Sequence, residues 1–298
     1  MTSAKPAPAD RRPSVWRLGG LTPWGLARAV AEQIRANNFL GRASEMAFDF
    51  LFAVFPLILF MLSLFGLFAS RSGELQRDLL SYFGDFLPGA AFDLLGKTAA
   101  ELAAHAGGGK LTVGIAMALW FASGGVRSMI SALNLTYRVR EARSWLRVRF
   151  VALGLTLAIS VLLLAALVMG LASERFLDWL GREIGLQPVV LEIWKQLRWP
   201  AAVVFLLLSF SLIYFFGPDL PERRWHWITP GSAFGGLMWF AGSIGFRIYL
   251  RFFNTYAATY GSLGAVMILL AWLYLAGLAF LVGGQINAEI ERATGNRR

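Results

Sequence analysis

Ionisable side chains inside long apolar stretches are the first candidates for chemistry, because a charge within a bilayer is costly to maintain. Asp49 lies about six residues into the first such stretch, roughly 9 Å deep at 1.5 Å per residue. Glu45 precedes it by one helical turn. Arg127 lies about six residues before the end of the second stretch, at roughly the same depth. An acid and a base at equal depth on neighbouring helices predict an ion pair.

Arg127 also belongs to a polar stripe along the second stretch. Its members recur at intervals of three or four residues and share one helix face: Ser123, Arg127, Ser131 and Asn134. Three interpretations of Arg127 stay open. Its long side chain reaches back to the lipid headgroups as an anchor, it forms a structural pair with Asp49, or it contacts a substrate.

The last apolar stretch ends in three polar residues on the same side of the membrane, Gln285, Asn287 and Glu289. Gln285 and Glu289 are i, i+4 neighbours, so they either join the Asp49 cluster or form a plain polar helix end. Other residues are assigned to helix shape and packing. Pro56 predicts a kink, and the small residues that permit close helix contact are Gly231, Gly235, Gly261 and Gly264.

The sequence lacks the motifs of common soluble enzymes: it has no Walker A loop, no dinucleotide-binding glycine fingerprint and no His-Glu-x-x-His. It contains no cysteine, and its two histidines, His105 and His226, fall on opposite sides of the membrane in the topology predicted below. A metal-dependent hydrolase needs clustered His, Asp or Glu ligands. We therefore expect no enzyme activity, no cofactor and no metal site.

The composition indicates that lipid surrounds most of the chain. Apolar residues make up 57% of the 298 positions and charged residues only 15%, against about 45–50% and about 25% in soluble domains. The apolar runs are continuous rather than alternating, which favours helices over a barrel. We predict an all-α, polytopic membrane bundle of about six transmembrane helices, at 43–69, 111–133, 150–172, 200–216, 228–246 and 263–286.

The remaining segments surround this membrane domain, which we place at 39–292. Residues 1–20 are polar and predict a disordered tail. Residues 21–38 begin with Thr22-Pro23, a helix-start signal, and predict an amphipathic helix on the membrane surface; an ordinary soluble helical tail is the alternative. The connection at 70–110 predicts short helices over the outer mouth of the bundle, and 293–298 form a C-terminal tail.

The distribution of basic residues predicts the orientation. Seventeen Lys and Arg lie in the N-terminal tail, the second and fourth connections and the C-terminal tail, against ten in the other three connections. The richer side is cytoplasmic by the positive-inside rule. The chain is therefore expected to be a multi-pass protein of a bacterial inner membrane, with both ends in the cytoplasm.

The C-terminal part of the sequence carries a long motif, TYGSLGAV at 259–266, WLY at 272–274 and GGQINAE at 283–289. With the Phe-Pro-Leu step at 55–57 and the Pro-Gly step at 230–231, it resembles the YihY/virulence factor BrkB family of inner-membrane proteins, once labelled ribonuclease BN. The resemblance covers about residues 39–292. It implies six helices and no agreed biochemical activity, and the ribonuclease label looks like a misassignment.

Three functions compete. The first is transport, or assistance to transport, of a lipid or other amphipathic solute in envelope homeostasis; the second is a non-transporting scaffold for envelope assembly; the third is a membrane nuclease, which the missing ligand cluster disfavours. The partners expected are membrane lipids, the solute itself, and a second copy of the chain or an envelope protein. Nucleic acid is not expected.

Overall fold

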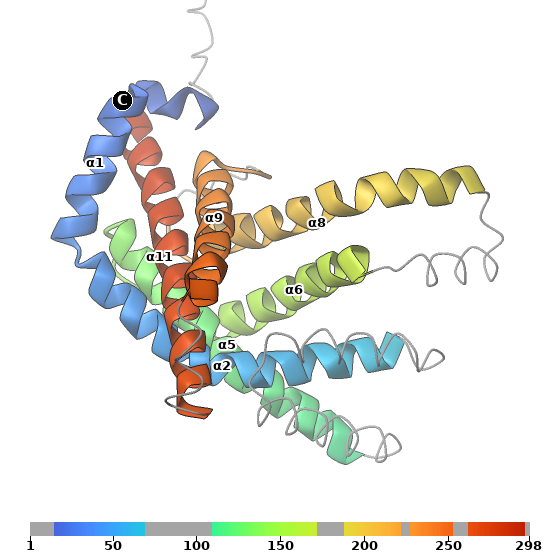
Figure 1. Ribbon diagram of the computed structural model, residues 1–298. Helices are drawn as coiled ribbons and strands as arrows, with labels where there is room; N and C mark the ends of the chain where they lie inside the picture. The colour runs from blue at the N-terminus through green and yellow to red at the C-terminus, as the bar shows by residue number, and fades with distance from the viewer. Residues whose placement is uncertain (1–14, 69–108, 172–187, 222–226, 253–261, 296–298) are drawn as a thin grey trace, which may run out of the picture.

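The computed structural model describes residues 15–68, 109–171, 188–221, 227–252 and 262–295, and every regular element in these ranges is helical (Figure 1). The elements are η1 (Val15–Gly20), α1 (Pro23–Ala36), α2 (Phe39–Phe68), α5 (Gly109–Thr136), α6 (Trp145–Leu171), α8 (Pro188–Phe216), α9 (Pro230–Phe252) and α11 (Ser262–Gly295). The predicted all-α helical bundle is confirmed.

The six long helices coincide one to one with the six predicted spans. By length and composition, four described segments can cross a membrane: Phe39–Met61, Val113–Thr136, Trp145–Ala166 and Val266–Gly295. Pro200–Phe216 is a shorter apolar segment, but α8 continues back through Pro200 to Pro188. The glycine-rich α9, with 23 residues, is not among the four candidates. The chain is thus a membrane protein with several apolar helices.

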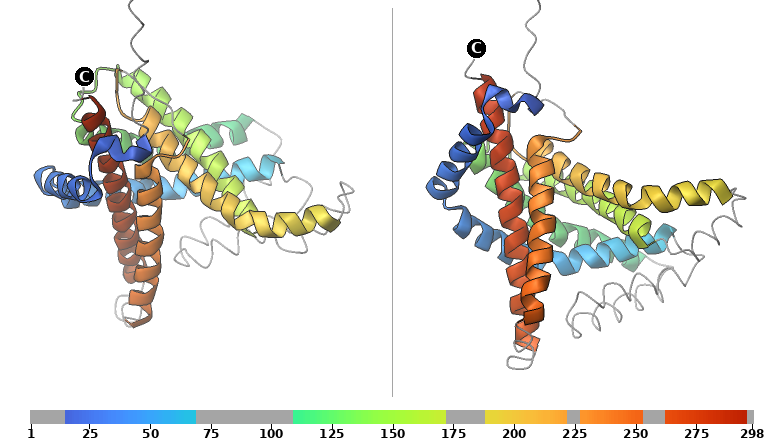
Figure 2. Two further views of the ribbon diagram at one scale, coloured as in Figure 1. Left: turned by 90° about the horizontal axis from the view of Figure 1, so that it is seen from above. Right: turned by 45° about the horizontal axis from the view of Figure 1, so that its top comes forward.

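One end of the bundle gathers the helix ends that the sequence places on the basic side. Here α2, α6 and α9 begin and α5, α8 and α11 end, and we call it the basic end. From it, α9 and α11 run together in one direction, while α2, α5, α6 and α8 run in another (Figures 1 and 2). The most extensive packing joins α2 with α5, α9 with α11, and α6 with α8.

The core lies where these two groups of helices meet. Its largest buried side chains come from four helices: Phe39 and Met46, Ile130 and Leu133, Tyr214, and Phe280. The Tyr214 hydroxyl donates a hydrogen bond of 2.7 Å to the Phe280 carbonyl. Small residues let α9 approach α11: a Cβ atom at Gly235 would lie 3.2 Å from the Ala279 carbonyl oxygen. Close backbone contact of this kind drives helix association in lipid.

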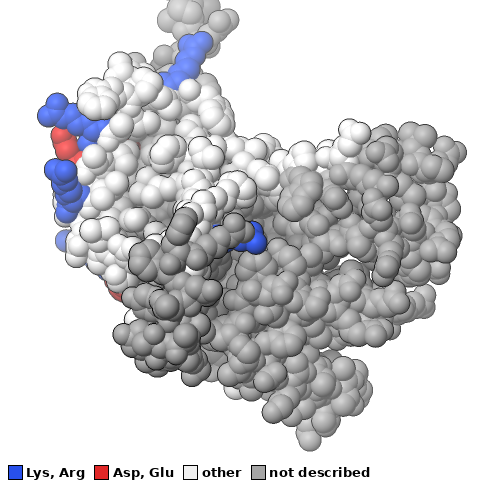
Figure 3. All heavy atoms as spheres, in the orientation of Figure 1, with Lys and Arg blue, Asp and Glu red and all other residues white. Residues whose placement is uncertain are grey.

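The N-terminal helix packs on the end of α11. Thr22 caps α1 by accepting a 3.1 Å hydrogen bond from the Gly25 amide, and Pro23 occupies the first turn. Leu26 and Val30 are buried against apolar residues of α11. Figure 3 shows charged side chains mainly along the edge that α1 forms, whereas the other described atoms in this view are mostly uncharged.

Part of the segment assigned to a disordered tail also packs on α11. Residues 15–20 form η1, in which Gly19 has a φ of +62°. A Cβ atom there would lie 2.7 Å from the Ile290 carbonyl oxygen, so only glycine fits. The connection predicted at 70–110 falls almost entirely outside the described residues, as do Gly261 and residues 296–298.

Candidate functional site

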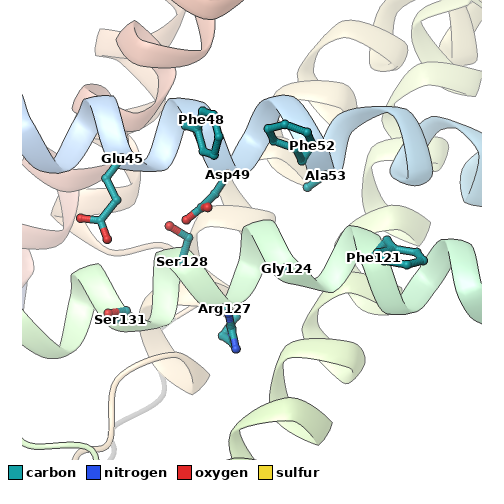
Figure 4. A pocket seen from close by; sticks show the side chains of 10 residues that line it. All are labelled: Glu45, Phe48, Asp49, Phe52, Ala53, Phe121, Gly124, Arg127, Ser128 and Ser131. Atoms are coloured by element: carbon teal, nitrogen blue, oxygen red, sulfur yellow. The ribbon is translucent and has the colours of Figure 1, made fainter.

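A pocket of about 670 Å³ lies between α2 and α5 (Figure 4). Its volume is in the range of about 300–1,000 Å³ typical of small-molecule sites. Five lining residues come from each helix: Glu45, Phe48, Asp49, Phe52 and Ala53 from α2, and Phe121, Gly124, Arg127, Ser128 and Ser131 from α5. It contains four of the residues that the sequence proposed as a site: Glu45, Asp49, Arg127 and Ser131.

Small residues on α5 create this space. At Gly125 the two helices touch, because a Cβ atom there would meet the Cβ of Ala53 at 3.0 Å. One residue earlier, a Cβ atom at Gly124 would meet nothing within 4 Å. The helices therefore pack along one line and leave an opening beside it.

The pocket combines polar groups with an aromatic rim. Asp49 is half-buried, and its carboxylate points toward the Ser128 hydroxyl group on α5 (Figure 4). Phe48, Phe52 and Phe121 are 57%, 64% and 59% exposed. A protein surface buried in lipid can leave such rings uncovered, and here they frame a carboxylate and hydroxyl groups. The site is suited to a molecule with one polar and one apolar part.

Glu45 has a partner of its own. Its carboxylate accepts a 2.8 Å hydrogen bond from Arg42, and both side chains are largely exposed. Exposed pairs of this kind contribute little to stability. Glu45 therefore stands at the outer edge of the pocket and does not pair with Arg127.

Asp49 and Arg127 share the pocket without forming an ion pair. Figure 4 shows the Arg127 side chain directed away from α2, and no ion pair among the described residues joins it to Asp49. The reason is rotational. Successive helical residues are about 100° apart, and Ser128 is the residue that faces Asp49, so Arg127 is turned off the α2 side. Equal depth brought the two residues to one pocket but did not bring their charges together.

The polar stripe on α5 divides for the same reason. On a helix with 3.6 residues per turn, two residues eight positions apart, such as Ser123 and Ser131, point in directions about 80° apart. Ser123 is fully buried and donates a 2.7 Å hydrogen bond to the Trp120 carbonyl of its own helix. Asn134 is also buried, whereas Arg127 and Ser131 are exposed and line the pocket.

Asn134 belongs instead to a second polar cluster, formed by Asn134, Glu141, Arg143 and Asp219, which we call the junction cluster. The Asn134 side chain donates to Glu141 at 2.8 Å and accepts from the Asp219 amide at 2.9 Å. Arg143 donates twice to Glu141, at 2.7 Å each, and to the Gly217 carbonyl at 2.8 Å. The cluster thereby joins the α5–α6 connection to the α8–α9 connection.

The one positive charge of the junction cluster is paired with two carboxylates. The Arg143 side chain is only 7% exposed and lies between Glu141 and Asp219. Its hydrogen bonds hold the pKa of Glu141 below the usual value, and the Glu141 carboxylate in turn raises the pKa of Arg143. Buried charges are stable only when they are paired and hydrogen-bonded in this way.

Gln285 and Glu289 join the ends of two helices and lie apart from the pocket. The fully buried Gln285 donates a 2.7 Å hydrogen bond to Glu289. Glu289 also accepts from Arg292 at 2.8 Å, and Arg292 donates to the Thr136 carbonyl at the end of α5 at 2.8 Å. Of the two interpretations, the structure shows a polar helix end, with an added tie to α5.

Asn287 connects α11 to the start of α9. It accepts a 2.9 Å hydrogen bond from the Gly231 amide and donates one of 2.9 Å to the Thr229 hydroxyl. The Gly231 amide lies in the first turn of α9, where no helical partner exists for it. The side chain thus caps α9.

Sequence reasoning missed Glu141, Arg143, Asp219 and Arg149. In the sequence, the arginines serve only as a signal of topology. The predicted span 150–172 also begins too late, because α6 begins at Trp145. One signal was available: Asp219 follows a Gly-Pro step directly after an apolar stretch, which marks a tight turn able to present a carboxylate. Among the described residues, no three His, Cys, Asp or Glu side chains come together as metal ligands would.

Comparison with known proteins gives one consistent family. The model of the virulence factor BrkB family matches residues 30–298. The ribonuclease-like protein YfkH of Bacillus subtilis is 31% identical over 84% of this chain and 90% of its own length. A UPF0761 membrane protein of Aliivibrio fischeri is 26% identical over 90% of this chain and 83% of its own length. No solved structure shows a significant match.

Proposed function

The chain belongs to the virulence factor BrkB family of membrane proteins, and we propose that it transports, or assists the transport of, a lipid or other amphipathic solute. The supporting observation is the α2–α5 pocket, in which an ionisable Asp49 and two serines lie beside three exposed phenylalanine rings. A polar headgroup would bind the carboxylate and hydroxyl groups, and the apolar part would lie against the rings.

The position of the rings determines how a solute would enter. Phe48 and Phe52 lie one helical turn apart on α2, with ring centroids 4.9 Å apart, and both face outward. In a bilayer this face meets lipid chains, so a solute would enter sideways from the membrane rather than through an aqueous pore. Asp49 has no ion-pair partner among the described residues and is therefore free to bind a headgroup.

A flux measurement tests this proposal. In proteoliposomes that contain a fluorescent phospholipid, the wild-type protein should accelerate transbilayer movement above that of protein-free vesicles. Asp49→Asn removes the charge and Ser128→Leu fills the pocket, so both variants should lose most of the added rate. Glu32→Gln, in an exposed pair with Arg28 on α1, is the matched control and should keep it. Wild-type vesicles no faster than protein-free ones would refute the proposal for this lipid.

The exposed rings also fit the alternative of a scaffold, in which Phe48, Phe52 and Phe121 contact a second protein. A photo-crosslinking residue at position 52 separates the two. Crosslinks to lipid support transport, whereas crosslinks to one defined protein, together with an absent flux, support the scaffold.

We propose no nuclease activity, although one relative is named ribonuclease-like. Purified protein, freed of contaminating nucleases, should leave RNA intact with any divalent metal ion. Metal-dependent cleavage that disappears in His226→Ala would overturn this expectation. Contaminating activity would survive that substitution, so the variant serves as the control.

A further inference from the structure

Arg149 is a buried charge that no acid among the described residues neutralises. Its relative exposure is 8%, and it lies on α6, one turn after Trp145. Within the described chain, no hydrogen bond or ion pair links it to a carboxylate. Buried charges of this kind are normally paired, so the missing counter-charge requires an explanation.

The contacts of Arg149 orient the guanidinium group without compensating its charge. One terminal nitrogen, Nη2, donates a 2.6 Å hydrogen bond to the Trp120 carbonyl on α5. The guanidinium carbon lies 3.8 Å from the centroid of the Trp120 ring, in cation–π contact. Nε is buried and has no acceptor among the described residues. The group is thus fixed in place with donor capacity left unused.

A second arginine makes the imbalance larger. The Arg127 side chain on α5 is directed away from α2 (Figure 4), and its positive charge acts on Arg149. It too lacks an ion-pair partner among the described residues. Two like charges therefore repel each other, and no carboxylate among the described residues pairs with either of them. Planar guanidinium groups bind phosphate oxygens with paired hydrogen bonds, and the single negative charge of a phosphodiester would offset half of the two positive charges.

We propose that Arg149 and Arg127 bind the phosphate group of an anionic phospholipid between α5 and α6. Trp120 and Trp145, whose ring centroids are 6.3 Å apart, flank the site, and tryptophan is typical of residues that lie at headgroup level. A soluble phosphate ion would satisfy the same donors, so the experiment must separate the two sources. Arg127 also lines the α2–α5 pocket, but Arg149 does not, so the site is centred outside the pocket and does not depend on transport through it.

Lipid binding to the whole protein tests this site. Delipidated protein in neutral detergent is titrated with phosphatidylglycerol, phosphatidylcholine or inorganic phosphate, and bound lipid is followed by native mass spectrometry. Wild-type protein should prefer phosphatidylglycerol. Arg149→Gln should weaken that binding by about tenfold, since charge-assisted hydrogen bonds are lost. Arg147→Gln, an exposed arginine two residues earlier, should bind like wild type.

Every outcome bears on the site. If Arg149→Gln fails to fold, Arg127→Gln, at an exposed position, is measured in its place and should also weaken the binding of phosphatidylglycerol. Binding of inorganic phosphate as tight as that of phosphatidylglycerol would overturn the assignment to a phospholipid and indicate a soluble anion as the ligand. Equal losses in the Arg147 and Arg149 variants, or none in the Arg149 and Arg127 variants, would overturn the proposal. Because Asp49 is unchanged throughout, a failed flux assay would not affect this result.

Discussion

The α2–α5 pocket and the junction cluster contain the same kinds of residue but differ in how their charges are paired. In the junction cluster, Arg143 lies between two carboxylates and donates to a backbone carbonyl. In the pocket, Asp49 and Arg127 have no ion-pair partner among the described residues. Polar groups that satisfy each other hold a fold together, whereas groups left unsatisfied are available to a ligand.

The difference follows from the backbone around each cluster. Apart from Asn134, which lies near the end of α5, the junction cluster lies in two connections. Turn amides and carbonyls there lack helical partners and can bind side chains, as the Asp219 amide and the Gly217 carbonyl do. The pocket lies between two continuous helices, whose backbone groups bond to one another. A charge there can pair only with another side chain or with a ligand.

The largest expected effect is the loss of Arg143. Arg143→Leu leaves Glu141 and Asp219 without their partner. Because these side chains are 29% and 21% exposed, we expect the lower end of the range for buried ion pairs, about 3 kcal/mol. We expect a loss of that size in the free energy of unfolding in detergent. Arg28→Leu, in an exposed pair on α1, is the control and should lose at most about 1 kcal/mol. Similar losses in the two variants would mean that the junction cluster is no more structural than a surface pair.

Asn134→Ala should have a smaller effect at the same cluster. It removes the acceptor of the Asp219 amide and one donor to Glu141, and an unsatisfied buried group costs about 1–3 kcal/mol. Ser131→Ala, on the exposed side of the same helix, should leave the unfolding free energy unchanged. A larger loss of unfolding free energy in Ser131→Ala than in Asn134→Ala would mean that Ser131, and not Asn134, faces the core.

The pH dependence of stability should reveal the Glu141 pair. Arg143 lowers the pKa of Glu141 from its usual value of 4.5. Because the folded-state pKa is the lower one, this stabilisation is complete above pH 4.5 and disappears as the pH falls through the folded-state value. The melting temperature of the wild type should therefore exceed that of Glu141→Gln at neutral pH, and this difference in melting temperature should disappear in acid. A gap that stays constant down to about pH 3 would exclude the pair as its source.

The helices could be predicted from the sequence because each is a long apolar run, and composition alone decides that. The predicted helix ends are less accurate. The predicted span 200–216 begins at Pro200, but α8 passes through this proline and begins at Pro188. A proline inside a membrane helix is tolerated when neighbours re-satisfy the freed carbonyl. The fourth span therefore includes residues before Pro200.

The candidate site could be predicted only in part. Rise per residue gave the depth of Asp49 and Arg127, and both line one pocket. Their rotation about the helix axes depends on how α5 packs against α2, α6 and α11, which no local pattern encodes. The junction cluster was missed because Asn134 and Asp219 are 85 positions apart, and only the folded connections bring them together.

The smallest expected effect concerns Asp49 and Arg127 themselves. Equal depth alone predicts a pair with a coupling of about 0.5–3 kcal/mol, whereas residues that do not touch are additive within about 0.3–0.5 kcal/mol. From the structure we expect additivity in a double-mutant cycle of Asp49→Leu and Arg127→Leu, measured by unfolding in nanodiscs. Arg42→Leu with Glu45→Leu, a 2.8 Å surface pair on α2, provides a contacting reference. Coupling well above that of the reference would show that the two charges meet in the membrane, and the pocket would then resemble the junction cluster, a paired structural site. Additive stability together with a lost flux in Asp49→Leu would keep the two clusters distinct, because a carboxylate that contributes little to folding but is needed for transport must act on something outside the protein.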